Sequence, residues 1–424
     1  MLIEFRVSNF KSIREEVTLS LAASSDPSHP DNVISYHSPD DERVLRTAAI
    51  YGPNASGKSN VIAALAVMQF IVLNSHNFQK GVRLPFVPFK FSEGCKNEPT
   101  SFEVDFVEDG TEYTYGLKFN ASQITEEHLY YYPKGRKATV FERYGKEFTF
   151  KIDRKEQQFL SEMTLDNVLY ISRATQMNYG KTVPVIKWFA ERLRVMGPIE
   201  VQPQNERYTL EVMERSKESR ESIMRSMSAA DFGIVDIDAH VKEMSEDEFN
   251  LMINQMPNEW KPLLGQVKGK LRTNDIRMKH RVVGPDGKPQ IKELPLVEES
   301  EGTKRLFTLI GYWIDALQNG RVVIYDELEV KLHHFLTAFL IGLFNDPEQN
   351  RKGAQLIFTS HDVDLLDQEL FRRDQIWFTE KDADSGSTRL YSLDEFSERK
   401  DRDIEKGYLT GRYGALPFIQ GRVV

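Results

Sequence analysis

Apolar and polar residues alternate along the first third of the chain in a way that predicts β-strands. The run Glu108-Asp109-Gly110, between the alternating stretches at 102–107 and 113–119, is typical of a hairpin turn. The sequence predicts strands at 2–7, 17–22, 47–51, 102–107, 113–119, 139–142 and 148–150. Residues 24–44 are rich in Ser, Pro, Asp and His and are expected to form a loop.

Helical spacing of apolar residues dominates elsewhere. Asn60–Phe70 predicts a helix directly after the strand at 47–51, and 155–262 shows mainly helical periods, with Val185–Val195 as the clearest amphipathic stretch. Strands at 277–283 and 291–294 flank an evident turn. After residue 298, helices and strands alternate. We expect helices at 302–317 and 331–344, and strands at 322–326, 356–359 and 375–379.

These changes of pattern predict an α/β protein in three parts. Residues 1–120 would form a β-rich N-terminal lobe, 121–295 an inserted helical and β-ribbon subdomain, and 296–424 a C-terminal lobe.

The run Gly52–Ser59, GPNASGKS, fits the phosphate-loop pattern G-x-x-x-x-G-K-[ST] at every constrained position. A strand precedes it and a helix follows it, which is the context that the motif requires. Backbone N–H groups and the helix N-terminus would bind phosphates, Lys58 would reach the outer phosphates, and the Ser59 hydroxyl would bind Mg²⁺. The alternative, a glycine-rich turn before an ordinary helix, is disfavoured by this context.

Two later strands end in residues that suit nucleotide chemistry. Asp326 and Glu327 follow a buried strand, where the first would hold Mg²⁺ and the second would polarise water. His361 ends the strand at 355–359 and would sense the terminal phosphate, although a lone histidine is more often structural. Ser300 is a good N-cap for the helix near 302, and Gly302 would permit close approach of a phosphate.

The composition of the chain excludes several classes of protein. With 424 residues, 40% of them hydrophobic, a net charge of −9 and one cysteine, the chain is neither a generally basic nucleic-acid binder nor a disulfide or multi-cysteine zinc scaffold. No signal-peptide core opens it, and apolar runs such as Phe335–Phe344 are too short to span a bilayer. We expect a cytoplasmic protein with no membrane partner.

A cluster of basic residues lies in the middle of the chain. It offers a contact to the phosphate backbone of a nucleic acid, but the solvated face of a β-ribbon is the favoured interpretation. The cluster comprises Lys268, Lys270, Arg272, Arg277, Lys279, His280 and Arg281.

The order of Lys58-Ser59, Ser300-Glu301-Gly302, Asp326-Glu327 and His361 resembles the ABC-type ATPase head, in the split form of SMC, Rad50 and RecF proteins. The opening IEFRVSNFKSI is similar to the start of that group. GPNASGKSN, ESEGTKRLF, YDELEVKLHH and GRYGALPF together resemble a narrower set, the bacterial AAA-type ATPases of phage-defence and abortive-infection systems, such as RloA, AbiL and the ATPase subunit of PARIS. The resemblance covers both ends of the chain well and 120–290 poorly.

The resemblance implies that two copies sandwich two ATP molecules with Mg²⁺. Glu327 and His361 would then be catalytic, and Ser59 and Asp326 would bind the metal. The implied nucleotide contacts are Lys11, Gly52, Pro53, Asn54, Ala55, Ser56, Gly57, Lys58, Ser59 and Asn60, with Ser300, Gly302 and Thr303 contributed by the other copy.

By this resemblance the chain is a slow, regulatory ATPase. It would be the switch subunit of an antiviral system, in a homodimer or larger assembly. About 60 residues follow His361, too few for the nuclease domain of related proteins, so a separate effector such as a nuclease is expected, with a phage-encoded trigger. A RecF-like DNA-maintenance ATPase and a nucleotide-binding scaffold with negligible turnover are the alternatives; nucleic acid is not the favoured partner.

Overall fold

The computed structural model describes residues 1–36, 43–197, 203–230, 233–243, 245, 247, 250, 272–366, 369–396 and 403–416. The chain divides into two compact units. The first unit comprises Met1–Pro198, Ala316–Val330 and His334–Val424, and the second comprises Ile199–Asp315 and Lys331–His333.

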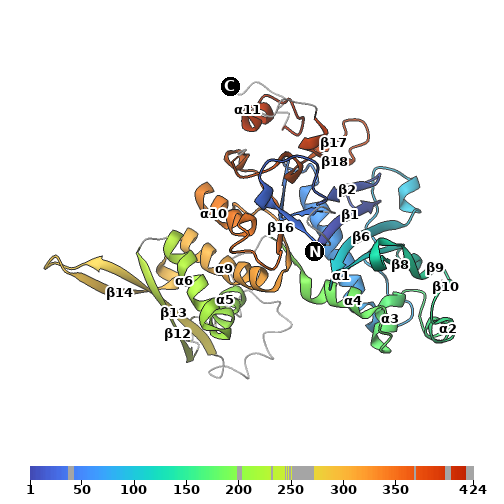
Figure 1. The fold of residues 1–424 in the computed structure, drawn as a ribbon, viewed down its shortest axis with the longest axis horizontal. Coiled ribbons are helices and arrows are strands. Elements are labelled where there is room, and N and C mark those ends of the chain that lie inside the picture. The colour runs from blue at the N-terminus through green and yellow to red at the C-terminus, as the bar shows by residue number, and fades with distance from the viewer. Residues whose placement is uncertain are drawn as a thin grey trace. The chain divides into compact units, whose positions relative to one another are not determined.

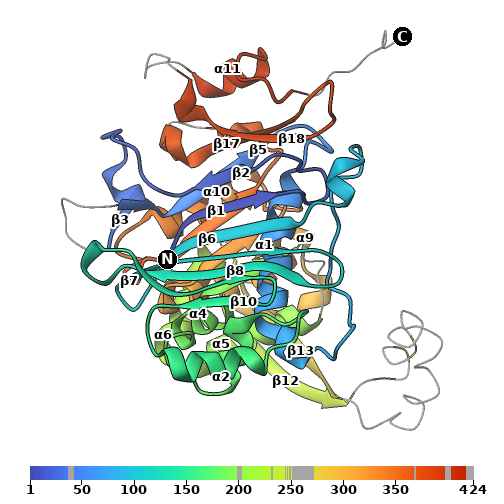
Figure 2. The ribbon, with the colours of Figure 1, turned by 90° about the vertical axis from the view of Figure 1, so that its right-hand side faces the viewer.

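A seven-stranded antiparallel sheet forms one layer of the first unit (Figures 1 and 2). Its order is β10-β9-β8-β7-β6-β1-β2, so the N-terminal strands pair with the later hairpins. The strands are β1 (Leu2–Ser8), β2 (Val17–Ser20), β6 (Thr100–Glu108), β7 (Thr111–Phe119), β8 (Ile124–Tyr131), β9 (Ala138–Tyr144) and β10 (Glu147–Phe150). The alternation of apolar residues predicts all of them except β8, because Glu127 in that strand points inward and interrupts the pattern.

A six-stranded sheet in the order β11-β15-β16-β5-β17-β18 forms another layer of this unit. All its neighbours pair in parallel except β17 and β18. The strands are β5 (Thr47–Tyr51), β11 (Leu193–Met196), β15 (Val322–Tyr325), β16 (Gln355–Thr359), β17 (Ile376–Lys381) and β18 (Thr388–Ser392). The fully buried runs of β5, β15 and β16 are typical of parallel strands that are covered on both faces. The α/β class expected from the sequence is confirmed.

Helix α1 (Lys58–Asn74) lies in the core that both sheets line, and its buried residues include Leu65, Met68 and Ile71. By length and composition, the segment Lys58–Asn77 is long and apolar enough to cross a membrane. The sequence, in contrast, predicts that every apolar run is too short to span a bilayer. The core helix of a folded protein passes the same test, because it too must be apolar around its circumference.

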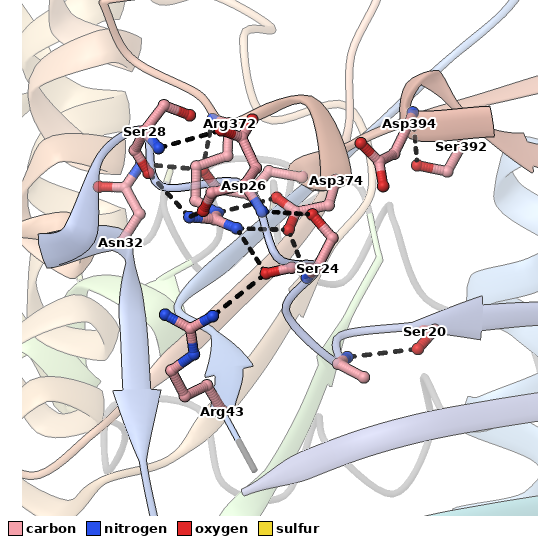
Figure 3. Close-up of polar contacts among 12 residues, drawn as sticks. Ser20, Ser24, Asp26, Ser28, Asn32, Arg43, Arg372, Asp374, Ser392 and Asp394 are labelled. Carbon is pink, nitrogen blue, oxygen red and sulfur yellow. Dashed lines mark hydrogen bonds and ion pairs between the residues drawn. The ribbon is translucent and has the colours of Figure 1, made fainter. Parts of the chain in front are cut away.

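Short helices complete the first unit: α2 (Arg154–Glu162), α3 (Tyr170–Gln176), α4 (Val183–Lys187), α10 (His334–Asn345) and α11 (Ile404–Leu409). The predicted helix at 185–195 is confirmed as far as Arg192, where it ends in a π-helical turn, and is wrong for its last three residues, because Leu193–Met196 pairs with β15 as an edge strand. The predicted loop at 24–44 contains the short strands β3 (Val33–Ser35) and β4 (Arg43–Leu45). Arg372 anchors this segment by donating to the carbonyls of Asp26 and Ser28, both at 2.7 Å (Figure 3).

The second unit contains α5 (Pro203–Arg215), α6 (Lys217–Ala230) and a sheet of β12 (Ile234–Glu243), β13 (Arg272–Val283) and β14 (Pro289–Pro295). It also holds the first part of α9 (Glu301–Asn319). The sequence predicts the β13–β14 hairpin and misses β12. This division differs from the expected one at residue 120, because β8 hydrogen bonds to β7 and continues the sheet of the first unit, and at residue 295, because the second unit extends to Asp315.

Glu127 is buried at the junction of the antiparallel sheet and α3. Its carboxylate lies 3.5 Å from Arg143 Nη1 and accepts the N–H groups of Tyr170 (2.7 Å) and Ile171 (3.0 Å). Removing one partner of a buried, hydrogen-bonded ion pair leaves the other charge and the amides without compensation.

We expect Glu127→Ala to lower the free energy of unfolding by about 3–5 kcal/mol. Denaturant unfolding followed by tryptophan fluorescence would measure it. The matched control is Glu126→Ala, since Glu126 pairs with Lys118 near the surface at 2.8 Å and should cost less than about 1 kcal/mol. Equal effects of the two substitutions would contradict the buried-anchor role.

Candidate functional site

The loop between β5 and α1 is held in a shape that only glycine permits at two positions. Gly52 and Gly57 have φ values of 151° and 114°. A Cβ atom at Gly52 would lie 2.4 Å from the carbonyl oxygen of Thr379, and one at Gly57 would lie 2.1 Å from Thr388 Oγ1. The loop therefore packs directly against the β17–β18 hairpin.

Hydroxyl groups join this loop to distant parts of the chain. Ser56 Oγ lies 2.6 Å from Thr379 Oγ1, and Thr388 Oγ1 donates to the Ser56 carbonyl at 2.8 Å. Ser12 Oγ lies 2.7 Å from Thr388 Oγ1 and accepts the Asn60 amide at 2.6 Å. Ser56 and Asn60 are thus fixed by residues from both ends of the chain.

Helix α1 presents a suitable end for an anion. Gly57 is its N-cap residue and supplies no side-chain cap hydrogen bond. Ser59 lies exposed in that turn. The N–H groups and the positive end of the helix dipole are therefore directed at a ligand position rather than at a protein cap.

Lys58 is buried beside the loop, and its Nζ donates to the carbonyls of Gly52 (2.7 Å) and Pro53 (3.2 Å). Burial lowers its pKa to about 8, although the nearby carboxylates of Asp326, Glu329 and Glu327 act to raise it. The amino group is thus a poorly solvated cation, for which an anionic ligand would be a better partner than carbonyl oxygens.

Thr359 organises the acidic end of β15. Its Oγ1 donates to Asp326 Oδ1 at 2.6 Å and accepts the N–H of Glu327 at 2.7 Å. Asp326 is buried, and Glu327 has a left-handed backbone with φ of 56°. Because β16 lies between β15 and β5, its last residue can bridge these acids to the phosphate-loop side of the sheet.

His361 lies on the same edge of this sheet. Its N–H donates to Glu329 Oε1 at 2.6 Å, and Glu329 Oε2 is buried without a hydrogen-bond partner among the described residues. Partial burial and the Lys58 cation lower the pKa of His361, so its imidazole is neutral at neutral pH. Lys58, Asp326, Glu327 and His361, which the sequence predicts as one site, are brought together.

A cavity of about 1010 Å³ opens on the loop and is lined by Gly52, Pro53, Asn54, Ser56 and His361. Its other walls come from the strand end Glu380–Lys381 and from the C-terminal residues around α11, including Tyr408, Leu409 and Leu416. The motifs did not indicate the C-terminal wall. They also missed Ser12, Thr359, Thr379 and Thr388, for which the available signal is a hydroxyl residue at the end of a buried strand or beside it.

Other predicted residues lie in different surroundings. Lys11 is exposed, its N–H donates to the Val87 carbonyl, and its ammonium lies 5.6 Å from the Phe10 ring. Ala55 is exposed at the tip of the loop with φ of 64°. Among the described residues, no hydrogen bond joins the Lys11 side chain to the loop.

Ser300, Gly302 and Thr303 lie in the second unit. Ser300 Oγ accepts the N–H of Thr303 at 3.1 Å, so the predicted N-cap of α9 is confirmed. A Cβ atom at Gly302 would meet nothing closer than the Lys331 carbonyl at 3.7 Å. The packing within this chain therefore does not require glycine there.

The donor set fits a nucleotide with a hard cation. Ser59 and Asp326 offer one hydroxyl and one carboxylate, and Mg²⁺ typically takes few protein ligands together with phosphate oxygens and water. Within the described ranges, no group of three or more His, Cys, Asp or Glu residues could hold a metal ion by itself.

A family model described as "AAA domain, putative AbiEii toxin, Type IV TA system" matches residues 48–367, which include the loop, the Asp326-Glu327 pair and His361. No curated protein matches the chain.

Solved SMC head domains match most of the chain at low identity. The SMC head of Thermotoga maritima is 14% identical, with 92% of this chain and 98% of that one covered and a TM-score of 0.40. The Smc head bound to the C-terminal winged-helix domain of ScpA is 13% identical, with 92% and 97% covered and a TM-score of 0.41. The Smc head of Pyrococcus yayanosii is 12% identical, with 93% and 99% covered and a TM-score of 0.38.

Gly57→Ala should weaken ATP binding by at least about tenfold, since the clash with Thr388 and the positive φ would distort the loop. Titration with a fluorescent ATP analogue would measure it. Gly342→Ala is the matched control, because a Cβ there meets nothing within 4 Å. Wild-type affinity of the Gly57 variant would contradict the packing argument.

The pKa of about 8 at Lys58 predicts pH-dependent binding. A triphosphate stabilises the charged amine, so affinity should be constant below about pH 8 and fall by up to about tenfold per unit above it. Calorimetry near pH 8.5 in buffers of different ionisation enthalpy should detect proton uptake on binding. Lys58→Arg, which stays charged, should remove both effects; a flat wild-type profile would refute the assignment.

Proposed function

The chain belongs to the AAA-domain family whose model spans residues 48–367, and from this we propose that it is an ATP-binding and hydrolysing switch subunit of an antiviral defence system. It would control a separate toxic effector, such as a nuclease, in the cytoplasm. The observation that carries the ATPase part is the convergence of Lys58, Asp326, Glu327 and His361 at one sheet edge beside the glycine loop.

The hydrolytic roles follow from this geometry. Lys58 would leave the Gly52 and Pro53 carbonyls for the outer phosphates, and Ser59 and Asp326 would hold Mg²⁺, which neutralises phosphate charge when bound. Glu327 would orient the attacking water and accept its proton. The neutral imidazole of His361 would donate a hydrogen bond to the terminal phosphate or accept one from a group beside it.

A second copy of the chain would complete the site. Ser300 is exposed and Gly302 is partly exposed at the start of α9, whereas Thr303 is buried there, and Gly302 has free space on its own chain. A glycine that its own fold does not need is well suited to close contact with a phosphate held by another copy. Glu301 pairs with Lys304 (3.2 Å) and Lys331 (3.0 Å), which holds this turn in place for such a contact.

The family description supports the defence context, since it names an AbiEii-type toxin and a toxin–antitoxin system. The sequence resemblance to phage-defence ATPases points in the same direction, and a phage-encoded trigger is part of this proposal. A RecF-like DNA-maintenance ATPase is the second candidate, because the β13–β14 ribbon carries exposed cations. Copurification of a nuclease without DNA-stimulated ATPase activity favours the first function, and DNA stimulation favours the second.

Lys58→Ala should abolish ATP binding. Glu327→Gln should retain it, lose hydrolysis and accumulate ATP-bound dimers, because the water is no longer activated while the sandwich still closes. Phosphate release and light scattering with and without ATP would measure the two effects.

Glu348→Gln, an exposed acid in the same unit, is the control and should behave as wild type. ATP binding by Lys58→Ala would rule out the loop assignment. A Glu327→Gln protein that hydrolyses ATP normally would rule out its role as the base, and one that stays monomeric with ATP would rule out the sandwich.

A further inference from the structure

The β13–β14 hairpin continues as a narrow two-stranded ribbon beyond the end of β12 (Figure 1). The last β12 pair joins Ile234 to His280, and the Arg281 N–H donates to the Gly233 carbonyl. From Val282 onward, β13 pairs with β14 alone, up to Val283 opposite Pro289. We call residues 281–292 the ribbon tip.

At the base of the ribbon, basic side chains are paired with carboxylates. Arg277, Lys279 and His280 of β13, which precede the tip, each contact a carboxylate of their own unit. The pairs are Arg277–Asp275 (2.9 Å), Lys279–Asp238 (2.5 Å) and His280–Glu299 (2.6 Å). These members of the basic cluster in the sequence are therefore poor candidates for an external anion.

At the ribbon tip, in contrast, the basic side chains are exposed to solvent. Arg281, Lys288 and Lys292 are exposed and form no ion pair within the described part of the chain. Asp286 is the only acid between them, and it accepts the backbone N–H of Lys288 at 3.2 Å. The tip thus carries a net positive charge in a chain whose formal net charge is −9.

Apolar side chains are exposed beside these cations. Val283 is 76% exposed and Ile291 is 55% exposed. The register places Arg281 opposite Ile291 and Val283 opposite Pro289, so these four side chains share one face. Lys292 is opposite His280 and lies on the other face, and Lys288 lies in the turn.

We propose that the ribbon tip docks in a groove of duplex DNA. A two-stranded ribbon has the width that the major groove admits, and the exposed Val283 and Ile291 suit contact with thymine methyl groups there. Cations on both faces suit a partner that encloses the ribbon between two phosphate backbones, whereas a flat acidic protein surface would meet one face only. This inference is independent of the nucleotide site and fits either function proposed above, since those two functions differ in whether DNA stimulates ATP hydrolysis and not in whether DNA is bound.

The test is binding of the full-length protein to a fluorescent duplex of about 20 base pairs, measured by anisotropy over a range of salt concentrations. The affinity of the wild-type protein should fall as the salt concentration rises. The slope of log affinity against log salt should include three phosphate contacts, from Arg281, Lys288 and Lys292. Changing Arg281, Lys288 and Lys292 together to Ala should reduce the slope by about 2–3 and weaken binding more than about tenfold at moderate salt. Val283→Ser with Ile291→Ser should weaken binding without changing the slope.

A triple Ala variant of Lys96, Lys146 and Lys217 removes the same charge from exposed positions elsewhere and should bind as wild type. Unchanged ATP affinity and thermal unfolding would show that the tip variants are folded, since the tip is solvent-exposed. The proposal fails if wild type does not bind the duplex, if the tip variant binds equally well, or if polyglutamate or single strands compete as strongly as the duplex.

Discussion

The close packing of Gly52 and Gly57 against Thr379 and Thr388 is the constraint on which the site depends. It forces the loop into positive φ values, brings the Gly52 and Pro53 carbonyls to Lys58, and fixes where α1 begins. A larger residue at either glycine would move the loop away from the hairpin. The direction of the helix dipole and the position of the lysine are thus consequences of contacts made more than three hundred residues away.

Strand order explains how the remaining charges reach this loop. β5 lies between β16 and β17, so the residues that follow all three strands meet at one edge. Thr359 then couples the acids after β15 to the same edge through two short hydrogen bonds. Lys58 and three carboxylates share a poorly hydrated space, where the cation is held with incomplete compensation.

Much of this arrangement could be predicted from the sequence, because alternation and buried apolar runs report directly on sheets with one or two covered faces. β8 was missed since its inward Glu127 is satisfied by Arg143 and by backbone donors far along the chain. The helix predicted at 185–195 runs three residues too far, since a short edge strand has no periodicity of its own. The motifs located Lys58, Asp326 and His361, whereas the threonines and the C-terminal cavity wall depend on tertiary contacts that local patterns do not encode.

The hydroxyl chain from Asn60 through Ser12 to Thr388 also bears on how the protein is made. During synthesis, the residues that shape the glycine loop emerge more than three hundred residues after the loop itself. A partly translated chain that stops before Thr379 would carry the loop's sequence without the contacts that shape it. The order of elements along the chain thereby postpones the final shape of the loop until β17 and β18 have been synthesised.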